Sequence, residues 1–185
     1  QSGQIEAVGF EMYTTMLERT IRELKGEEEI TKVPTQLNLA LNLRIPNDYI
    51  PEENQRLRMY KRVAGIEDEK QLEDVRAELI DRYGVPPAPV RNLLDAAALK
   101  LLSERVGVAS IDRKQHVINI KFSENANVDP SRLAQFVAGN KGAQFSPNGT
   151  LRFNLKSTHA EDALGRLTSL LQELSGLVLE VERVS

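Results

Sequence analysis

Apolar side chains recur at helical spacing through most of the first hundred residues. They return every three or four positions, the period of an amphipathic helix, in four stretches: residues 10–25, 52–64, 68–83 and 89–106. Asp68 with Gln71 resembles a capping box at the start of the third stretch. Gly84 suits the end of that helix, and Pro89 suits the first turn of the next one. The pattern therefore predicts helices over these four stretches.

A strict alternation of apolar residues with polar or small ones interrupts this helical pattern. Leucine or isoleucine occupies every second position from Leu37 to Ile45, with asparagine, alanine or arginine between them. A period of two is typical of a strand with one buried face and one wet face. Residues 37–45 are therefore predicted to form a strand.

Beyond Gly107 the pattern changes to short strands and tight turns. One hairpin is predicted over residues 108–122 and a second over residues 143–155. The second hairpin turns at Asn148-Gly149, a pair that tolerates the positive φ angles of a tight turn.

Each predicted hairpin is followed by a predicted helix. Asp129 and Pro130 open the first of these helices. A capping box of Thr158 and Glu161 opens the second. The predicted fold class is therefore α+β, a mixture of helices and strands, with a helical N-terminal half packed against an antiparallel sheet formed largely by two ββα units. Residues 177–184 are left as either an edge strand or a trailing end.

Composition limits the class of protein. The chain has 185 residues, of which 41% are hydrophobic and 28% charged, so it has enough apolar material for one domain with an attachment or two small domains. It contains no cysteine, no apolar run of membrane-spanning length and no signal-like start, so we expect a cytoplasmic protein without a membrane partner. The net charge of −3 gives no overall attraction to nucleic acid, and any basic face must be local.

No motif indicates catalysis. The nearest approach to a phosphate-binding loop, residues 139–142, lacks the required glycine and lysine spacing and is better interpreted as a turn. His116 and His159 lie far apart without a carboxylate at metal-binding spacing, and no GxSxG elbow occurs. A small-molecule enzyme would need a deep pocket with clustered titratable groups. We therefore expect no catalytic, cofactor-binding or metal-binding residues and no enzyme activity in this chain.

The predicted helix over residues 52–64 carries a basic cluster. Arg58, Lys61 and Arg62 fall on one side of it, whereas Leu57, Tyr60 and Ala64 fall on another. These cations could form the binding face of a nucleic-acid accessory domain. Alternatively, they are solvated and pair with the acidic helix that follows.

The next helix, residues 68–83, has an acidic outer face. Asp74, Glu78 and Asp81 lie three or four residues apart, so their like charges repel by a few tenths of a kcal/mol per pair. Leu72, Val75, Leu79 and Tyr83 cluster on the opposite side. The acidic face is either an ordinary solvated surface or the docking site of a partner that presents arginines.

Three ordered blocks of sequence carry a family resemblance. They are QSGQIEAVGFEMYTTMLERTIRELKG, IPNDYIPEENQRLRMYKRVA and ELIDRYGVPPAPVRNLLDAAALK, which together cover most of the first hundred residues. In these blocks the chain resembles the C-terminal domain of bacterial transcription-repair coupling factors (Mfd). Beyond Gly107 the resemblance rests mainly on the order of the elements.

The resemblance implies a division of the chain and a role in DNA repair. Residues 1–28 would be an arm helix and linker from the end of the translocase module, and residues 29–185 would be a C-terminal TRCF-type domain. Proteins of this family use ATP to translocate on DNA, displace stalled RNA polymerase and recruit the excision-repair protein UvrA, with motor motifs that lie outside this chain. The terminal domain would be an autoinhibitory clamp that masks the UvrB-like, UvrA-recruiting module until translocation releases it.

The resemblance also assigns a role to the acidic face. Asp74, Glu78 and Asp81 would contact arginines of the UvrB-like module in the resting protein, with Glu78 and Asp81 as the main contacts. RNA polymerase and DNA would be partners only through the rest of the protein, and the isolated domain is expected to be a monomer.

Overall fold

A computed structural model describes residues 34–155 and 160–176. The predicted arm helix, Thr158 of the second capping box, His159 and residues 177–184 lie outside this range. In chain order the elements are β1 (Gln36–Asn38), α2 (Glu53–Ala64), α3 (Glu69–Tyr83), α4 (Ala88–Val106), β2 (Val108–Lys114), β3 (Val117–Phe122), α5 (Pro130–Gly139), β4 (Gln144–Ser146), β5 (Thr150–Asn154) and α6 (Ala160–Ser175). The α+β class predicted from the sequence is confirmed, and so are the helices that correspond to α2, α3 and α4.

The strands form a five-stranded sheet in the order β1-β2-β3-β5-β4. Strands β2 to β5 pair antiparallel, and the order β2-β3-α5 followed by β4-β5-α6 confirms the two ββα units. Strand β1 adds a parallel edge, which the sequence did not predict. A parallel pair needs a long crossover, and here helices α2, α3 and α4 supply it.

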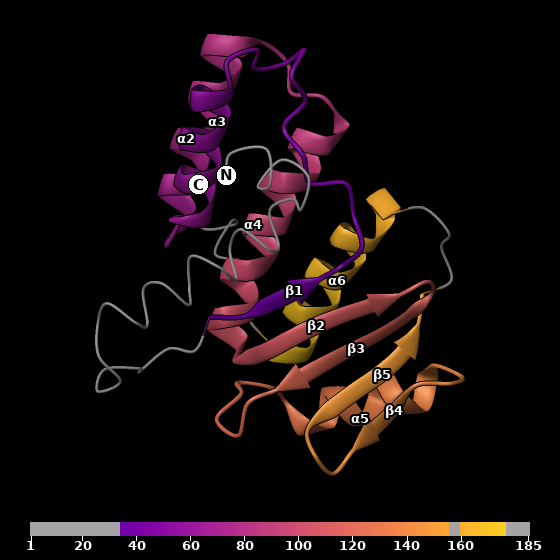
Figure 1. Ribbon diagram of the computed structural model, residues 1–185. Coiled ribbons are helices and arrows are strands. Elements are labelled where there is room, and N and C mark those ends of the chain that lie inside the picture. The colour runs from indigo at the N-terminus through magenta and orange to yellow at the C-terminus, as the bar shows by residue number, and fades with distance from the viewer. Residues whose placement is uncertain (1–33, 156–159, 177–185) are drawn as a thin grey trace, which may run out of the picture.

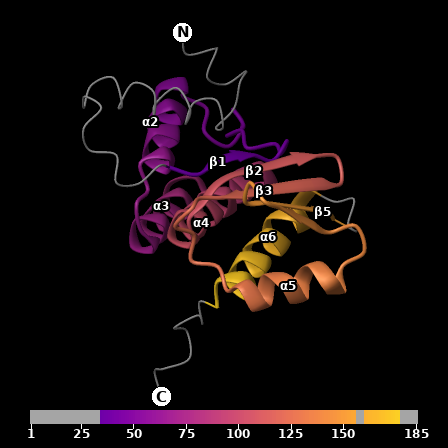
Figure 2. The same cartoon turned by 90° about the horizontal axis from the view of Figure 1, so that it is seen from below.

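Helices α4, α5 and α6 lie on one face of the sheet, as Figures 1 and 2 show. Helices α2 and α3 pack beside α4, away from the strands (Figure 1). The buried apolar residues of the helices and the strands form one continuous cluster, in which α4 contributes residues such as Val90, Leu94 and Leu99. Helix α4 therefore joins the helical part to the sheet.

The predicted strand over residues 37–45 is wrong beyond its first residues, because only Gln36–Asn38 pair with β2. The alternation itself is real, since Leu39, Leu43 and Ile45 are buried and the residues between them are exposed or half-buried. Ala40 has a φ of +52°, which takes the chain out of strand geometry. Further on, the Ile45 amide donates to the Tyr60 hydroxyl at 2.6 Å instead of to a neighbouring strand. The segment is thus an extended connection that inserts every second side chain into the core.

The buried side of α2 also differs from the predicted one. It consists of Arg56, Met59, Tyr60 and Val63, whereas Leu57 and Ala64 are only partly buried. Arg56 can lie inside because its Nη1 donates to the carbonyls of Ile50 at 2.6 Å and Pro51 at 2.8 Å. A prediction from hydropathy places arginine on the outside of a helix. The predicted apolar face is therefore rotated from the observed buried face by about a quarter of the helix circumference.

Candidate docking face on helix α3

Local sequence determines where α3 begins and which side it buries. The Asp68 side chain accepts from the Gln71 amide at 2.7 Å, as the capping box predicted. The Gln71 side chain accepts from the amide of Glu67, one residue earlier than in a standard box. Leu72, Val75 and Leu79 are buried as predicted.

The three predicted site residues have different surroundings. Asp74 and Asp81 are exposed, whereas the Glu78 side chain is only 28% exposed because α2 lies beside it. Within residues 34–155 and 160–176, no ion pair joins Asp74 or Asp81 to another residue. These two carboxylates are therefore the ones available to a partner.

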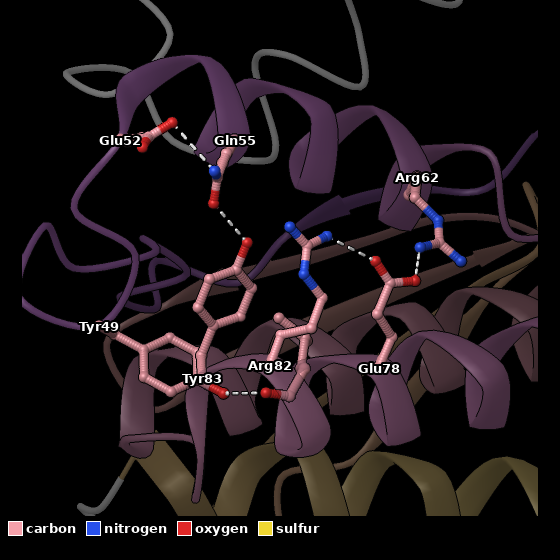
Figure 3. Close-up of polar contacts among 8 residues, drawn as sticks. Tyr49, Glu52, Gln55, Arg62, Glu78, Arg82 and Tyr83 are labelled. Atoms are coloured by element: carbon pink, nitrogen blue, oxygen red, sulfur yellow. Dashed lines mark hydrogen bonds and ion pairs between the residues drawn. The ribbon is translucent and has the colours of Figure 1, made fainter.

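Glu78 is held between two arginines (Figure 3). One carboxylate oxygen pairs with Arg62 of α2, and the other accepts from Arg82 Nη1 at 3.0 Å. The sequence left open whether the basic cluster of α2 pairs with the acidic helix. Arg62 makes this pair with Glu78. Arg58 and Lys61 are exposed and have no ion pair within the described part of the chain.

Two tyrosines hold the end of α3 against α2 and the segment before it. Sequence reasoning placed Tyr83 on the inner side of the helix but missed Tyr49 and the hydrogen bonds of both. Tyr83 donates to the Gln55 side chain at 2.7 Å (Figure 3). Tyr49 donates to the Gly84 carbonyl at 2.9 Å and to the Leu79 carbonyl at 3.2 Å. The rings lie 5.8 Å apart, and the Arg82 guanidinium lies 5.2 Å from the centre of the Tyr83 ring. Burial, and secondarily the neighbouring Tyr83, raises the pKa of Tyr49. These contacts hold the end of α3 in place.

Apolar residues accompany the two available carboxylates. Gly84 ends α3 with φ +82° and ψ −162°, a conformation that glycine alone adopts readily, and the chain then presents Val85 at 84% exposure. Ile80, next to Asp81, is 48% exposed. Asp74, Ile80, Asp81 and Val85 are called the α3 docking face below. In the sequence, the valine directly after the glycine that ends the predicted helix is the signal that could have indicated an apolar residue at this surface.

Arg76, on the same helix, is already engaged with carboxylates of its own chain. Arg76 lies between Glu73, at 3.4 Å, and Asp95 of α4, at 4.0 Å. Desolvation raises the pKa of Asp95, against the opposing effects of Arg76 and Arg91. The face therefore combines two available carboxylates with two exposed apolar side chains, which suits the docking of a cationic protein surface.

Other kinds of site are not found in the described residues. They contain no group of three or more His, Asp or Glu side chains placed to hold a metal ion. His116 lies in the exposed turn between β2 and β3. In the part of the chain that the structure covers, none of the helices combines the length and the apolar character needed to cross a membrane.

Comparison with known proteins shows similarity to the transcription-repair coupling factors. A family model described as the TRCF domain matches residues 39–133. The transcription-repair-coupling factor of Escherichia coli (strain K12) is 36% identical over 138 residues, and that of Haemophilus influenzae is 37% identical over 142 residues. The matches cover 72% and 74% of this chain but only 12% of each relative, so the chain spans about an eighth of their length.

A solved structure shows the same fold. The crystal structure of the C-terminal domain of a transcription-repair coupling factor matches with a TM-score of 0.67 at 23% identity. The match covers 80% of this chain and 98% of that one.

Proposed function

Because the chain belongs to the TRCF domain family, we propose that it is the non-catalytic, regulatory C-terminal domain of a transcription-repair coupling factor. In this proposal the α3 docking face holds the UvrB-like module of the same protein and masks its UvrA-recruiting site. Translocation on DNA would release the module. RNA polymerase and DNA would be reached through the rest of that protein, which would act in the cytoplasm.

The observation that carries the docking role is that Asp74 and Asp81 are exposed and have no ion pair within the described residues, on a helix that also exposes Ile80 and is followed by the exposed Val85. Two guanidinium groups of a partner could form forked pairs with the carboxylates. The apolar side chains would lose water at the same time. Glu78, already held by Arg62 and Arg82, would contribute only after exchanging an arginine.

The expected strength suits a contact that must break. An exposed ion pair contributes about 0–1 kcal/mol, and covering a half-exposed isoleucine or an exposed valine adds about 1 kcal/mol each. The total of a few kcal/mol is weak between separate molecules but sufficient within one chain, where tethering raises the effective concentration. A translocating motor could therefore open the clamp, and salt should loosen it.

The test measures binding of the 185-residue chain to the separately purified UvrB-like module by NMR titration, which detects contacts with a Kd of about 1 mM, over a range of salt concentrations that starts low. Asp74→Arg with Asp81→Arg should abolish binding, and in the full-length protein it should increase UvrA binding. This pair is a cleaner probe than Glu78→Arg with Asp81→Arg, because an arginine at position 78 would lie between Arg62 and Arg82.

The control is a reversal of equal charge at exposed positions away from α3, Glu124→Arg with Glu173→Arg. It should leave binding unchanged. If the folded Asp74/Asp81 variant still masks UvrA binding in the full-length protein, the clamp does not use this face.

A further inference from the structure

The outer face of the sheet lies opposite helices α4, α5 and α6 (Figure 2). Two rows of residues that cross all five strands on this face are polar. Strand register aligns one row of side chains across all five strands: Asn38, Asp112, Asn119, Arg152 and Gln144. A second row is Gln36, Ser110, Lys121, Thr150 and Ser146. The row between these two lies on the helix side of the sheet and is entirely apolar: Leu37, Ile111, Ile120, Leu151 and Phe145, of which Phe145 on the edge strand is still 44% exposed.

The charges on this outer face are unbalanced. Lys121 and Arg152 are exposed, and Lys114 adds a third exposed cation in the next, shorter row beside Val117 and Asn154. None of the three cations has an ion pair within the described residues.

The one carboxylate in these rows, Asp112, offsets only one of the three cations. It accepts from Asn38 Nδ2 at 2.7 Å and from Ser110 Oγ at 3.2 Å, two neutral donors that leave its negative charge in place. A chain with a net charge of −3 therefore carries a local positive surplus on a broad sheet face.

The residue types indicate which partner this surplus fits. Amide, hydroxyl and cationic side chains are the groups that donate to phosphate oxygens. Asparagine is unfavourable in strands, yet Asn38, Asn119 and Asn154 all occupy outward strand positions. The face lacks the apolar and aromatic anchors of a protein–protein interface, because Val117 is the only apolar residue in these three rows.

The residue types in these rows favour duplex over single-stranded nucleic acid as the ligand. Proteins that bind single strands on a sheet stack the bases on aromatic side chains, and these rows contain none. We propose that the outer face of the sheet binds the phosphate backbone of duplex nucleic acid without sequence preference, with Lys114, Lys121 and Arg152 as the cationic contacts.

This site differs from the basic cluster of α2. Arg62 of that cluster is already paired with Glu78, which leaves Arg58 and Lys61 there. The sheet face also does not involve the α3 docking face, so either proposal can fail without the other.

The test titrates the 185-residue chain into a short, fluorescently labelled DNA duplex at several salt concentrations. Three phosphate contacts should give a slope of log K against log salt of about −2.7, and mixed-sequence duplexes should bind equally. Lys121→Glu with Arg152→Glu should weaken binding at least tenfold at low salt, because two attractive charges become repulsive. Both side chains are exposed, and the fold of each variant is checked by circular dichroism.

The matched control, Arg58→Glu with Lys61→Glu, makes the same change in net charge on α2 and should leave binding within about twofold. Four outcomes would overturn the proposal: no binding at low salt, equal weakening by both double variants, tighter binding to the single strand, or equal binding to polyglutamate. The last would mean that the face recognises acidic protein instead of nucleic acid.

Discussion

At the scale of single residues, Arg62 and an arginine of a docking partner would compete for the same carboxylate. Glu78 pairs with Arg62 in the free domain, so its charge is compensated before any partner arrives. We expect Arg62→Ala to strengthen binding to the UvrB-like module two- to fivefold, since an exposed pair of about 0–1 kcal/mol no longer has to be broken. NMR titration at low salt measures this change.

Arg58→Ala is the matched control for Arg62→Ala. It removes the same charge one helical turn away, from a side chain without an ion pair in the described part of the chain. Equal gains from both variants would mean that only net charge matters. A loss of binding in Arg62→Ala would mean that Arg62 itself contacts the partner.

At the scale of elements, the junction between α4 and β2 depends on Gly107. This residue has φ +87° and ψ +37°, and its carbonyl accepts from the Ser123 amide at 2.9 Å. A Cβ at this position would lie 2.7 Å from the Ala126 Cα, in addition to the cost of the left-handed conformation. We expect Gly107→Ala to lower the free energy of unfolding by about 2 kcal/mol or more, measured by urea denaturation.

Gly165→Ala provides the contrast. Gly165 lies inside α6, has no atom within 4 Å of an added Cβ and has no positive φ. Alanine there should be neutral or stabilising by up to about 1 kcal/mol. If both substitutions have the same effect, the close approach at Gly107 is not what constrains the junction.

At the scale of the whole molecule, one core joins the helices to the sheet, so both parts should unfold together. Leu99 of α4 is fully buried in this core, and α4 packs against α3, α6 and β2. Leu99→Ala should cost about 2–5 kcal/mol, whereas Leu133→Ala on the partly buried face of α5 should cost less. Hydrogen exchange of α2 and β3 amides should report one common transition in Leu99→Ala. Separate transitions would show two independent units.

The sequence predicted the elements well where local signals were strong. Periodicity together with Asp68, Gly84 and Asp129 located the helices and their ends, and the turn at Gly149 located the second hairpin. These signals succeed because caps and turns depend on neighbouring residues alone. The acidic composition of the outer face of α3 could be derived in the same way.

Only the tertiary structure decided how these elements use their side chains. Ala40 takes the chain out of strand geometry after three paired residues, carbonyls of a preceding segment draw Arg56 inside, and Arg62 reaches Glu78 from another helix. Each outcome depends on contacts between residues that the local pattern does not bring together. The sequence by itself therefore determined the α+β class, the order of the elements and the acidic helix, because these follow from local periodicity and capping. The tertiary structure decided which carboxylates remain available and that the polar rows of all five strands lie side by side, because both depend on the packing of distant segments.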